Sequence, residues 1–327
     1  MGKSQHHTPV LHLRNFVGTA PEGHVWTYDK QTGTRRSSIP EETGFETHFY
    51  SVERDDGTMD TTIENLLAEI ESKAAPVYRD LLKDKICHGQ PKSDFANFVA
   101  CIFARTPSMR RMFAETLSRD LQIRNYAYGT NDKAFESFIS RSGKDRPPHL
   151  PEGRETLRKA LTDPSQFVIE ISREATLRSL GVMDKLTPIF FDMAWSLVHA
   201  KHGYFVTSDN ALARACDPRS RSPTLGDGGF LNETVEVTLP LSPSTMLLMT
   251  WADSPLPIFE APREAVEGWN MMRAAHAERF LYAHVDDKRV ARLAAQQKET
   301  RPKIAIEGFG PKKFAETIIR RRSNRSK

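Results

Sequence analysis

The 327-residue sequence contains only three cysteines, and no two of them form a Cys-x-x-Cys pair. This odd and widely spaced set is typical of reduced thiols and argues against a disulfide scaffold or a zinc knuckle. No apolar run approaches the roughly 18 residues that a membrane span needs, and no apolar segment of a secretory signal follows the N-terminus. These absences predict a cytoplasmic protein with no membrane partner.

The sequence also lacks the compact motifs of several enzyme classes. It contains no GxxxxGK[ST], GxGxxG, HExxH or GxSxG segment. Simple nucleotide-binding loops, zincins and α/β-hydrolases are therefore excluded. Enzymes built from scattered residues remain compatible with the sequence.

Positive charge is scarce in the body of the chain and concentrated at its C-terminus. The formal net charge is +4, and residues 312–327 alone hold seven Lys and Arg against one Glu. The body is therefore not typical of a nucleic-acid-binding domain, whereas the tail can contact the phosphates of a nucleic acid. The alternative is a solvated, flexible terminus. We expect residues 1–300 to form one domain and 301–327 a basic, flexible tail.

The hydrophobic pattern predicts an α+β fold, a mainly helical single domain around a small, largely antiparallel sheet. One sheet would join a hairpin at 25–38 to strands near 204, 236 and 247, which would bring the N-terminus close to Ser208 and Asp209. The expected helices are 5–16, 61–81, 93–106, 109–121, 132–142, 151–162, 166–180, 185–200, 262–282 and 286–298.

The N-terminal segment SQHHTPVLHLRNF is apolar and rich in histidine. On a helix, His6, His7 and His12 point in different directions, since successive residues differ by about 100°. A zinc site made from this segment alone is therefore not predicted. His6 is the candidate general acid or base, because imidazole titrates near neutral pH. The alternative is a hydrogen-bonded histidine with a structural role.

Two glutamates mark one face of the helix expected at 61–81. Glu64 and Glu71 are seven residues apart, which places them about 10 Å apart along the helix axis. Such carboxylates can orient a histidine or bind a divalent cation such as Mg²⁺. The alternative is that they are ordinary glutamates at the boundary of the buried face. The sequence leaves the metal itself unknown.

Arg105 stands directly before Thr106-Pro107. A proline cannot donate to the carbonyl one turn back, so it ends or kinks a helix and frees backbone acceptors. An arginine at this point can pair with a carboxylate or a phosphate. The alternative is a buried ion pair that holds the kink.

The segment Ser208-Asp209-Asn210 follows a short apolar strand. A carboxylate at the end of a strand is well placed to act as a catalytic acid, because the sheet fixes its position. The same residues are also good N-caps for a turn at 211–215. Both interpretations fit the sequence.

Seven segments in order resemble one family. They are QHHTPVLHLRNF, VWTYDKQTG, TTIENLLAEIE, FARTP, FVTSDNA, LPLSPSTMLL and AERFLY, and together they resemble the bacterial domain-of-unknown-function family 4238. His7, His12 and Thr8 depart from its pattern in a way typical of a packing face, and Ala211 replaces an expected proline. The resemblance implies a site but no reaction. Its recurrent polar positions fall on Gln5, His6, Glu64, Glu71, Arg105, Ser208, Asp209 and Ser242.

These observations lead to two functional hypotheses. The first is a hydrolase or nuclease acting on a phosphate ester, in which His6 is the general acid or base, Asp209 orients it or helps bind a metal, and Arg105 stabilises a phosphate. Glu64 and Glu71 would be supporting or metal-binding carboxylates, and Gln5, Ser208, Asn210 and Ser242 would be binding residues. The alternative is a non-enzymatic binding or effector module in which the same polar network is structural.

Overall fold

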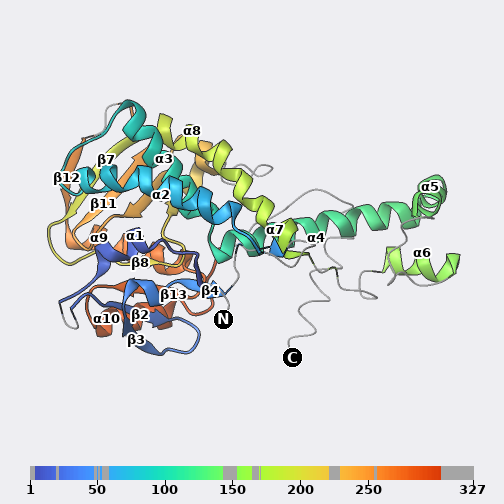
Figure 1. The fold of residues 1–327 in the computed structure, drawn as a ribbon, viewed down its shortest axis with the longest axis horizontal. Coiled ribbons are helices and arrows are strands. Elements are labelled where there is room, and N and C mark those ends of the chain that lie inside the picture. Colours follow the sequence, from blue (N-terminus) through green and yellow to red (C-terminus); the bar gives the residue numbers. More distant parts are fainter. Residues whose placement is uncertain are drawn as a thin grey trace. The chain divides into compact units, whose positions relative to one another are not determined.

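The computed structural model describes residues 4–19, 22–47, 50, 52–53, 59–142, 153–163, 169, 171–220, 229–253 and 256–302. Its Cα packing divides the chain into two compact units (Figure 1). Unit 1 comprises Met1–Arg111 and Leu177–Lys303, and unit 2 comprises Met112–Thr176 and Ile304–Lys327. Compactness does not decide whether the units fold separately, so the single domain over 1–300 stays a prediction. The basic tail lies outside the described residues from position 303.

A five-stranded sheet forms the centre of unit 1. All neighbouring strands are antiparallel except the first pair, which is parallel. In spatial order the strands are β12 (Ile258–Ala261), β7 (Ala194–Ala200), β11 (Thr245–Thr250), β10 (Glu236–Pro240) and β9 (Ala213–Ala215).

Helices cover both faces of this sheet. One face packs against α2 (Thr62–Leu81), α3 (Gly89–Ala104) and α8 (Met183–Asp192), which lie together in Figure 1. The other face packs against α9 (Arg263–His276). The side chains alternate as a pleated strand requires: Leu197 of β7 faces the first layer, and the next residue, Val198, faces Val266 of α9.

A second, antiparallel sheet of four strands completes unit 1. Residues Tyr28 and Leu281 face α10 (Lys288–Gln296), and Tyr282 on the opposite face packs against α1 (Val10–Leu13) and the 3-10 turn Arg14–Phe16. The spatial order is β3 (Arg35–Ser38), β2 (Val25–Asp29), β13 (Phe280–Ala283) and β8 (Thr207–Ser208).

Two short strand pairs flank α1 and α2. Strand β1 (Ser4–His6) pairs with β4 (Phe45–Thr47), and β5 (Val52–Glu53) pairs with β6 (Met59–Asp60). The turn before β4 requires a glycine, because Gly44 has φ +69° and a Cβ there would lie 2.8 Å from the Cβ of Thr8. The carbonyl of Gly44 accepts the backbone N–H groups of His7 and Thr8 at 2.9 and 3.1 Å, which fixes the N-terminal segment.

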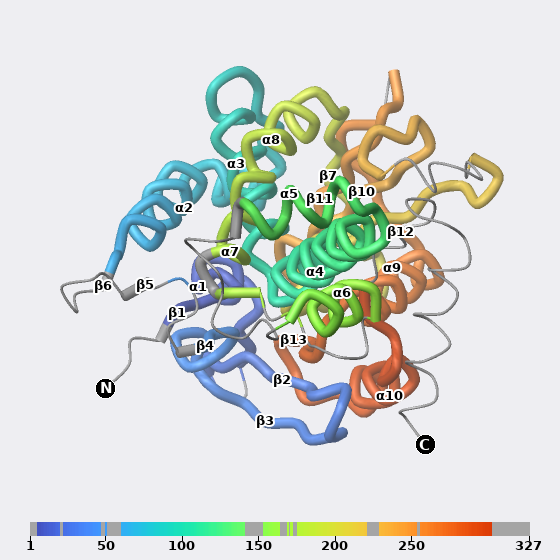
Figure 2. Tube along the Cα trace, turned by 90° about the vertical axis from the view of Figure 1, so that its right-hand side faces the viewer, coloured from blue at the N-terminus to red at the C-terminus, as the bar shows by residue number. Residues whose placement is uncertain are grey.

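Unit 2 is helical. It contains most of α4 (Pro107–Thr130), with α5 (Asp132–Ser142), α6 (Arg154–Thr162) and most of α7 (Arg173–Leu177). Phe135 packs against Leu157 and Leu161, and the guanidinium of Arg158 lies 4.4 Å from the ring of Phe135. Helix α6 runs beside α4 (Figure 2), at the point where Gly129 adjoins Leu161.

The α+β class with a mainly helical composition is confirmed, as are the hairpin at 25–38 and the helices α2, α3, α5, α6 and α10. Four predictions are wrong. Residues 194–200 and 280–283 are strands, residues 4–6 form a strand that precedes a helix of one turn, and two large sheets replace the single one. Strands β7 and β13 were mistaken for helix because both of their faces are buried, which gives a continuous apolar run without alternation. Of the helix expected at 166–180, residues 173–177 form α7 and residues 178–182 form a 3-10 turn, whereas residues 166–168 and 170 lie outside the described residues.

None of the helices in the described ranges is both long and apolar enough to cross a membrane. Cys87, Cys101 and Cys216 are all free thiols. A cytoplasmic location stays a prediction.

Candidate functional site

Gln5 links three segments of the chain. Its side-chain amide donates to Glu64 of α2, and its side-chain carbonyl accepts the backbone N–H of Tyr50. The hydroxyl of Tyr50 in turn donates to the carbonyls of His6 and Arg105 at 3.4 and 3.3 Å. Because the glutamine is only 4% exposed, these bonds are protected from water.

Arg105 is the C-cap residue of α3, where the helix stops before Pro107. Its Nη1 lies 2.7 Å from Oε1 of Glu71, and its Nε donates to the carbonyl of His7 at 3.2 Å. The arginine side chain is 2% exposed and that of Glu71 is 26% exposed. Arg105 therefore forms an ion pair with Glu71 at the point where α3 ends, and its role in a site stays a prediction.

His6 lies at the edge of this cluster and is half-buried. Its Nε2 is 3.0 Å from the carbonyl of Glu41, and its ring contacts Phe45 edge-on. A carbonyl can only accept, so Nε2 carries the proton and Nδ1 keeps its lone pair. Burial, together with the charge of Arg105, lowers the pKa of His6, although the bond to Glu41 opposes the shift. The imidazole is therefore neutral at pH 7.

Asp209 follows β8 and belongs to a different network. Its Oδ1 accepts the backbone N–H of Glu278 at 2.9 Å, and its Oδ2 accepts those of Arg279 and Phe280 at 2.8 Å each. The side chain is 2% exposed, and burial raises its pKa to about 6 against the lowering effect of the three N–H groups. Asp209 thus ties the end of β8 to the turn that leads into β13.

Replacing Asp209 by alanine is expected to lower the free energy of unfolding by about 2–4 kcal/mol, because three partly buried N–H groups lose their acceptor. Asp209→Asn keeps one carbonyl oxygen and removes a buried charge, so it should lose less. Denaturant unfolding measures both, with the exposed Asp192→Ala as the matched control. A loss for Asp209→Ala no larger than for the control would contradict this structural role.

The residues beside Asp209 are also held by the fold. The Ser208 hydroxyl donates to the carbonyl of Asn210 at 2.8 Å, and the Asn210 amide donates to the carbonyl of His276 at 3.0 Å. The sequence predicted that these residues cap a turn at 211–215. This prediction is wrong, because 213–215 form strand β9. Ser242 lies in the turn between β10 and β11, where its hydroxyl accepts the backbone N–H of Thr245 at 3.1 Å.

The nine predicted residues thus fall into three places. Gln5, His6, Glu64, Glu71 and Arg105 share one network, Ser208, Asp209 and Asn210 share a second, and Ser242 stands in a turn of its own. Within the described part of the chain, no three His, Cys, Asp or Glu side chains are grouped so that they can hold a metal ion. A divalent cation such as Mg²⁺ stays a prediction.

The N-terminal segment reaches β8 through His12, which the sequence pattern assigns only to packing. Its Nε2 lies 2.8 Å from Oγ1 of Thr207, and its Nδ1 lies 3.0 Å from the hydroxyl of Tyr78. Because this hydroxyl donates to the carbonyl of Leu241 at 2.8 Å, it accepts from Nδ1–H, and Nε2 accepts from the threonine. Burial lowers the pKa of His12 to about 3. The only sequence signal was a histidine on an apolar helix face.

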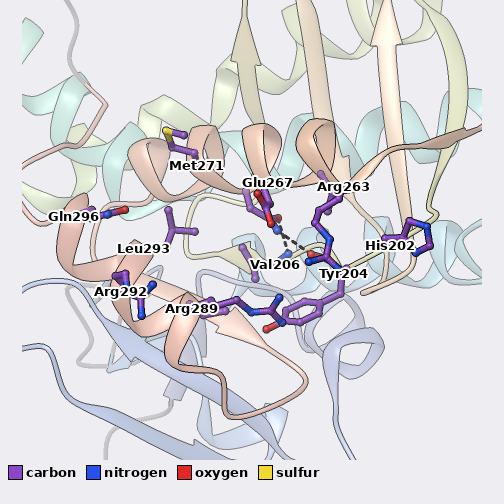
Figure 3. Close-up of a pocket in the computed structure, with 14 residues that line it drawn as sticks. His202, Tyr204, Val206, Arg263, Glu267, Met271, Arg289, Arg292, Leu293 and Gln296 are labelled. Atoms are coloured by element: carbon purple, nitrogen blue, oxygen red, sulfur yellow. Dashed lines mark hydrogen bonds between the residues drawn. The ribbon is translucent and has the colours of Figure 1, made fainter.

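Sequence reasoning also missed a cleft between α9 and α10. It has a volume of about 330 Å³ and is closed at its base by residues 202–206 (Figure 3). Arg263 and Glu267 of α9 face Arg289 and Arg292 of α10. None of the nine predicted residues lines this cleft. The signal in the sequence was two arginines three residues apart on a short amphipathic helix.

The comparisons with known proteins identify a family and no activity. The family described as "Protein of unknown function (DUF4238)" matches residues 4–287. No curated protein and no solved structure matches the chain. The match does not bear on the source organism, so a bacterial origin stays a prediction.

Proposed function

The chain belongs to the DUF4238 family, and we propose that it is a non-enzymatic binding or effector module whose polar networks hold the fold together. One observation carries this proposal: Arg105 and Asp209, each 2% exposed, are both bound by other groups of the protein itself. A phosphate bound at Arg105 would have to displace Glu71. A substrate or metal at Asp209 would have to displace three backbone N–H groups, at about 1–3 kcal/mol for each group left without a partner.

A hydrolase or nuclease acting on a phosphate ester is the second candidate, and His6 favours it. Its Nδ1 lone pair is available as a base, and the ring is only half-buried. Glu71, with a quarter of its side chain exposed, is close enough for its charge to act on this imidazole. Both side chains of this pair retain access to solvent.

The two candidates predict different results for the same protein samples. We expect the full chain to cleave no RNA, DNA or bis(p-nitrophenyl) phosphate, with or without Mg²⁺ or Mn²⁺. We expect Glu71→Gln to lower the unfolding temperature, because it weakens the ion pair to Arg105. The exposed His88→Ala is the control for His6→Ala. Cleavage that His6→Ala abolishes at an unchanged unfolding temperature would overturn the proposal.

A further inference from the structure

The cleft between α9 and α10 carries an excess of positive charge that the fold does not use. Arg263 and Arg292, one on each wall, make no ion pair or hydrogen bond with any other described residue. Arg289 is neutralised, since its guanidinium holds both carboxylate oxygens of Asp287 at 2.7–3.3 Å. Glu267 is the one acidic residue of the lining. The two unpaired guanidinium groups favour an anion.

The base of the cleft is apolar and rigid. Val206, Val266 and Val290 line it and are at most 4% exposed. The amide of Asn270 donates to the carbonyl of Tyr204 at 2.8 Å and accepts the N–H of Val206 at 3.0 Å, which joins the loop to α9. These are the dashed bonds in Figure 3. A preformed floor lowers the entropic cost of binding.

The polar groups are distributed along the cleft rather than gathered at one point. In Figure 3, Arg263 and Arg289 point toward the end that Tyr204 closes, whereas Arg292 lies with Leu293 and Gln296 at the other end and Glu267 stands between. The ring of Tyr204 is fixed there, because its hydroxyl donates to Asp287 at 2.6 Å and Arg289 lies 5.8 Å from the ring. A ligand in this cleft would therefore place an anionic group at the Tyr204 end, a hydrogen-bond donor beside Glu267 and an apolar part toward Leu293.

We propose that this cleft binds a small organic phosphate that carries a flat ring and a donor group, of the size of a nucleoside monophosphate. Three phosphate oxygens match the forked donors of arginine, and a rigid ring on the valine floor loses less entropy than a flexible chain. A volume of about 330 Å³ is at the lower end of ligand sites, which suits a small metabolite. The inference rests on the proposed function in one respect, since both take the protein to act by binding.

Calorimetry on the full chain tests this inference with AMP, adenosine, inorganic phosphate and octyl phosphate. AMP is expected to bind at least tenfold more tightly than each of the other three. Arg263→Gln with Arg292→Gln is expected to weaken AMP binding at least tenfold, and both residues are exposed, so the fold should be kept. The exposed helical arginine in Arg79→Gln is the matched control, with no change expected.

Three outcomes would overturn the inference: AMP that does not bind, AMP that binds the double variant as tightly as the wild type, and inorganic phosphate that binds as tightly as AMP, which would be an adventitious ion only. Chromatography of the same samples shows whether AMP is hydrolysed. Hydrolysis that His6→Ala abolishes would contradict the proposed function and leave the cleft in place. Failure of AMP to bind the wild-type chain would contradict the cleft and leave the proposed function in place.

Discussion

Between pH 6 and pH 4 the free energy of unfolding is expected to fall by at least roughly 1.4 kcal/mol per pH unit. Burial, aided by nearby arginine charge, lowers the pKa of His7 and of His12 from 6.5 to about 3. In this pH range the unfolded chain therefore binds a proton at each of these two histidines, whereas the folded chain does not. The stability contributed by these two groups is complete above pH 6.5 and is lost as the pH falls toward 3.

Asp209 acts in the opposite direction in the same pH range. Burial raises its pKa from 3.8 to about 6, so the folded state takes up this proton before the unfolded state does. Stability from this group is gained as the pH falls from 6 to 3.8. One of the two histidine contributions is therefore cancelled in this window. Burial also lowers the pKa of His6, His276 and His284, which act in the same direction as His7 and His12, so the net slope corresponds to at least one proton.

His12→Asn tests this account, because the amide keeps a donor for Tyr78 and does not titrate. The variant is expected to be less stable at pH 7 but to show a slope that is smaller than that of the wild type by roughly 1.4 kcal/mol per pH unit between pH 6 and pH 4. Urea unfolding at half-unit pH steps measures both quantities. The exposed His88→Asn should keep the wild-type slope. An unchanged slope in His12→Asn would contradict the assignment of the acid sensitivity to this buried histidine.

Helix α2 was predicted correctly because it has one buried face. In α2 the buried residues Leu67, Ile70, Ala74, Val77 and Leu81 recur at helical spacing, and the exposed residues between them make the period visible. Strand β7 has no such contrast, since α3 and α8 cover one face and α9 covers the other. Its position between two helical layers is a property of the whole unit, which local periodicity does not record.

The sequence identified residues that take part in polar networks, but it predicted less well which of these residues contact one another. Glu71 and Arg105 are 34 positions apart, and only the packing of α2 against α3 brings them together. Asp209 was expected beside His6, but its carboxylate binds the turn before β13, a segment that was read as helix. Because this segment was expected to be helical, its backbone N–H groups were not predicted as partners of Asp209. Family resemblance can mark which polar residues recur without saying which of them meet.

Replacing Arg105 by methionine is expected to lower the free energy of unfolding by about 3–5 kcal/mol. The change leaves the carboxylate of Glu71 without its cation and the carbonyl of His7 without a side-chain donor. Because Glu71 is 26% exposed, water can solvate part of its charge, which places the loss toward the lower end of this range. Arg105→Lys should lose an intermediate amount, since one ammonium group does not reproduce the guanidinium fork.

The chain supplies its own matched control for this ion pair. Lys73 and Glu69 form a pair on α2 with the same 2.7 Å separation, but their side chains are 58% and 62% exposed. Lys73→Met is expected to leave stability unchanged within error, because solvent screens an exposed pair. A double-mutant cycle of Arg105→Met with Glu71→Gln should show a large coupling energy, whereas the cycle for the exposed pair should show none. Equal coupling in the two cycles would mean that distance alone sets the strength. Coupling confined to Arg105 and Glu71 would instead show that the strength of the N-terminal network comes from burial.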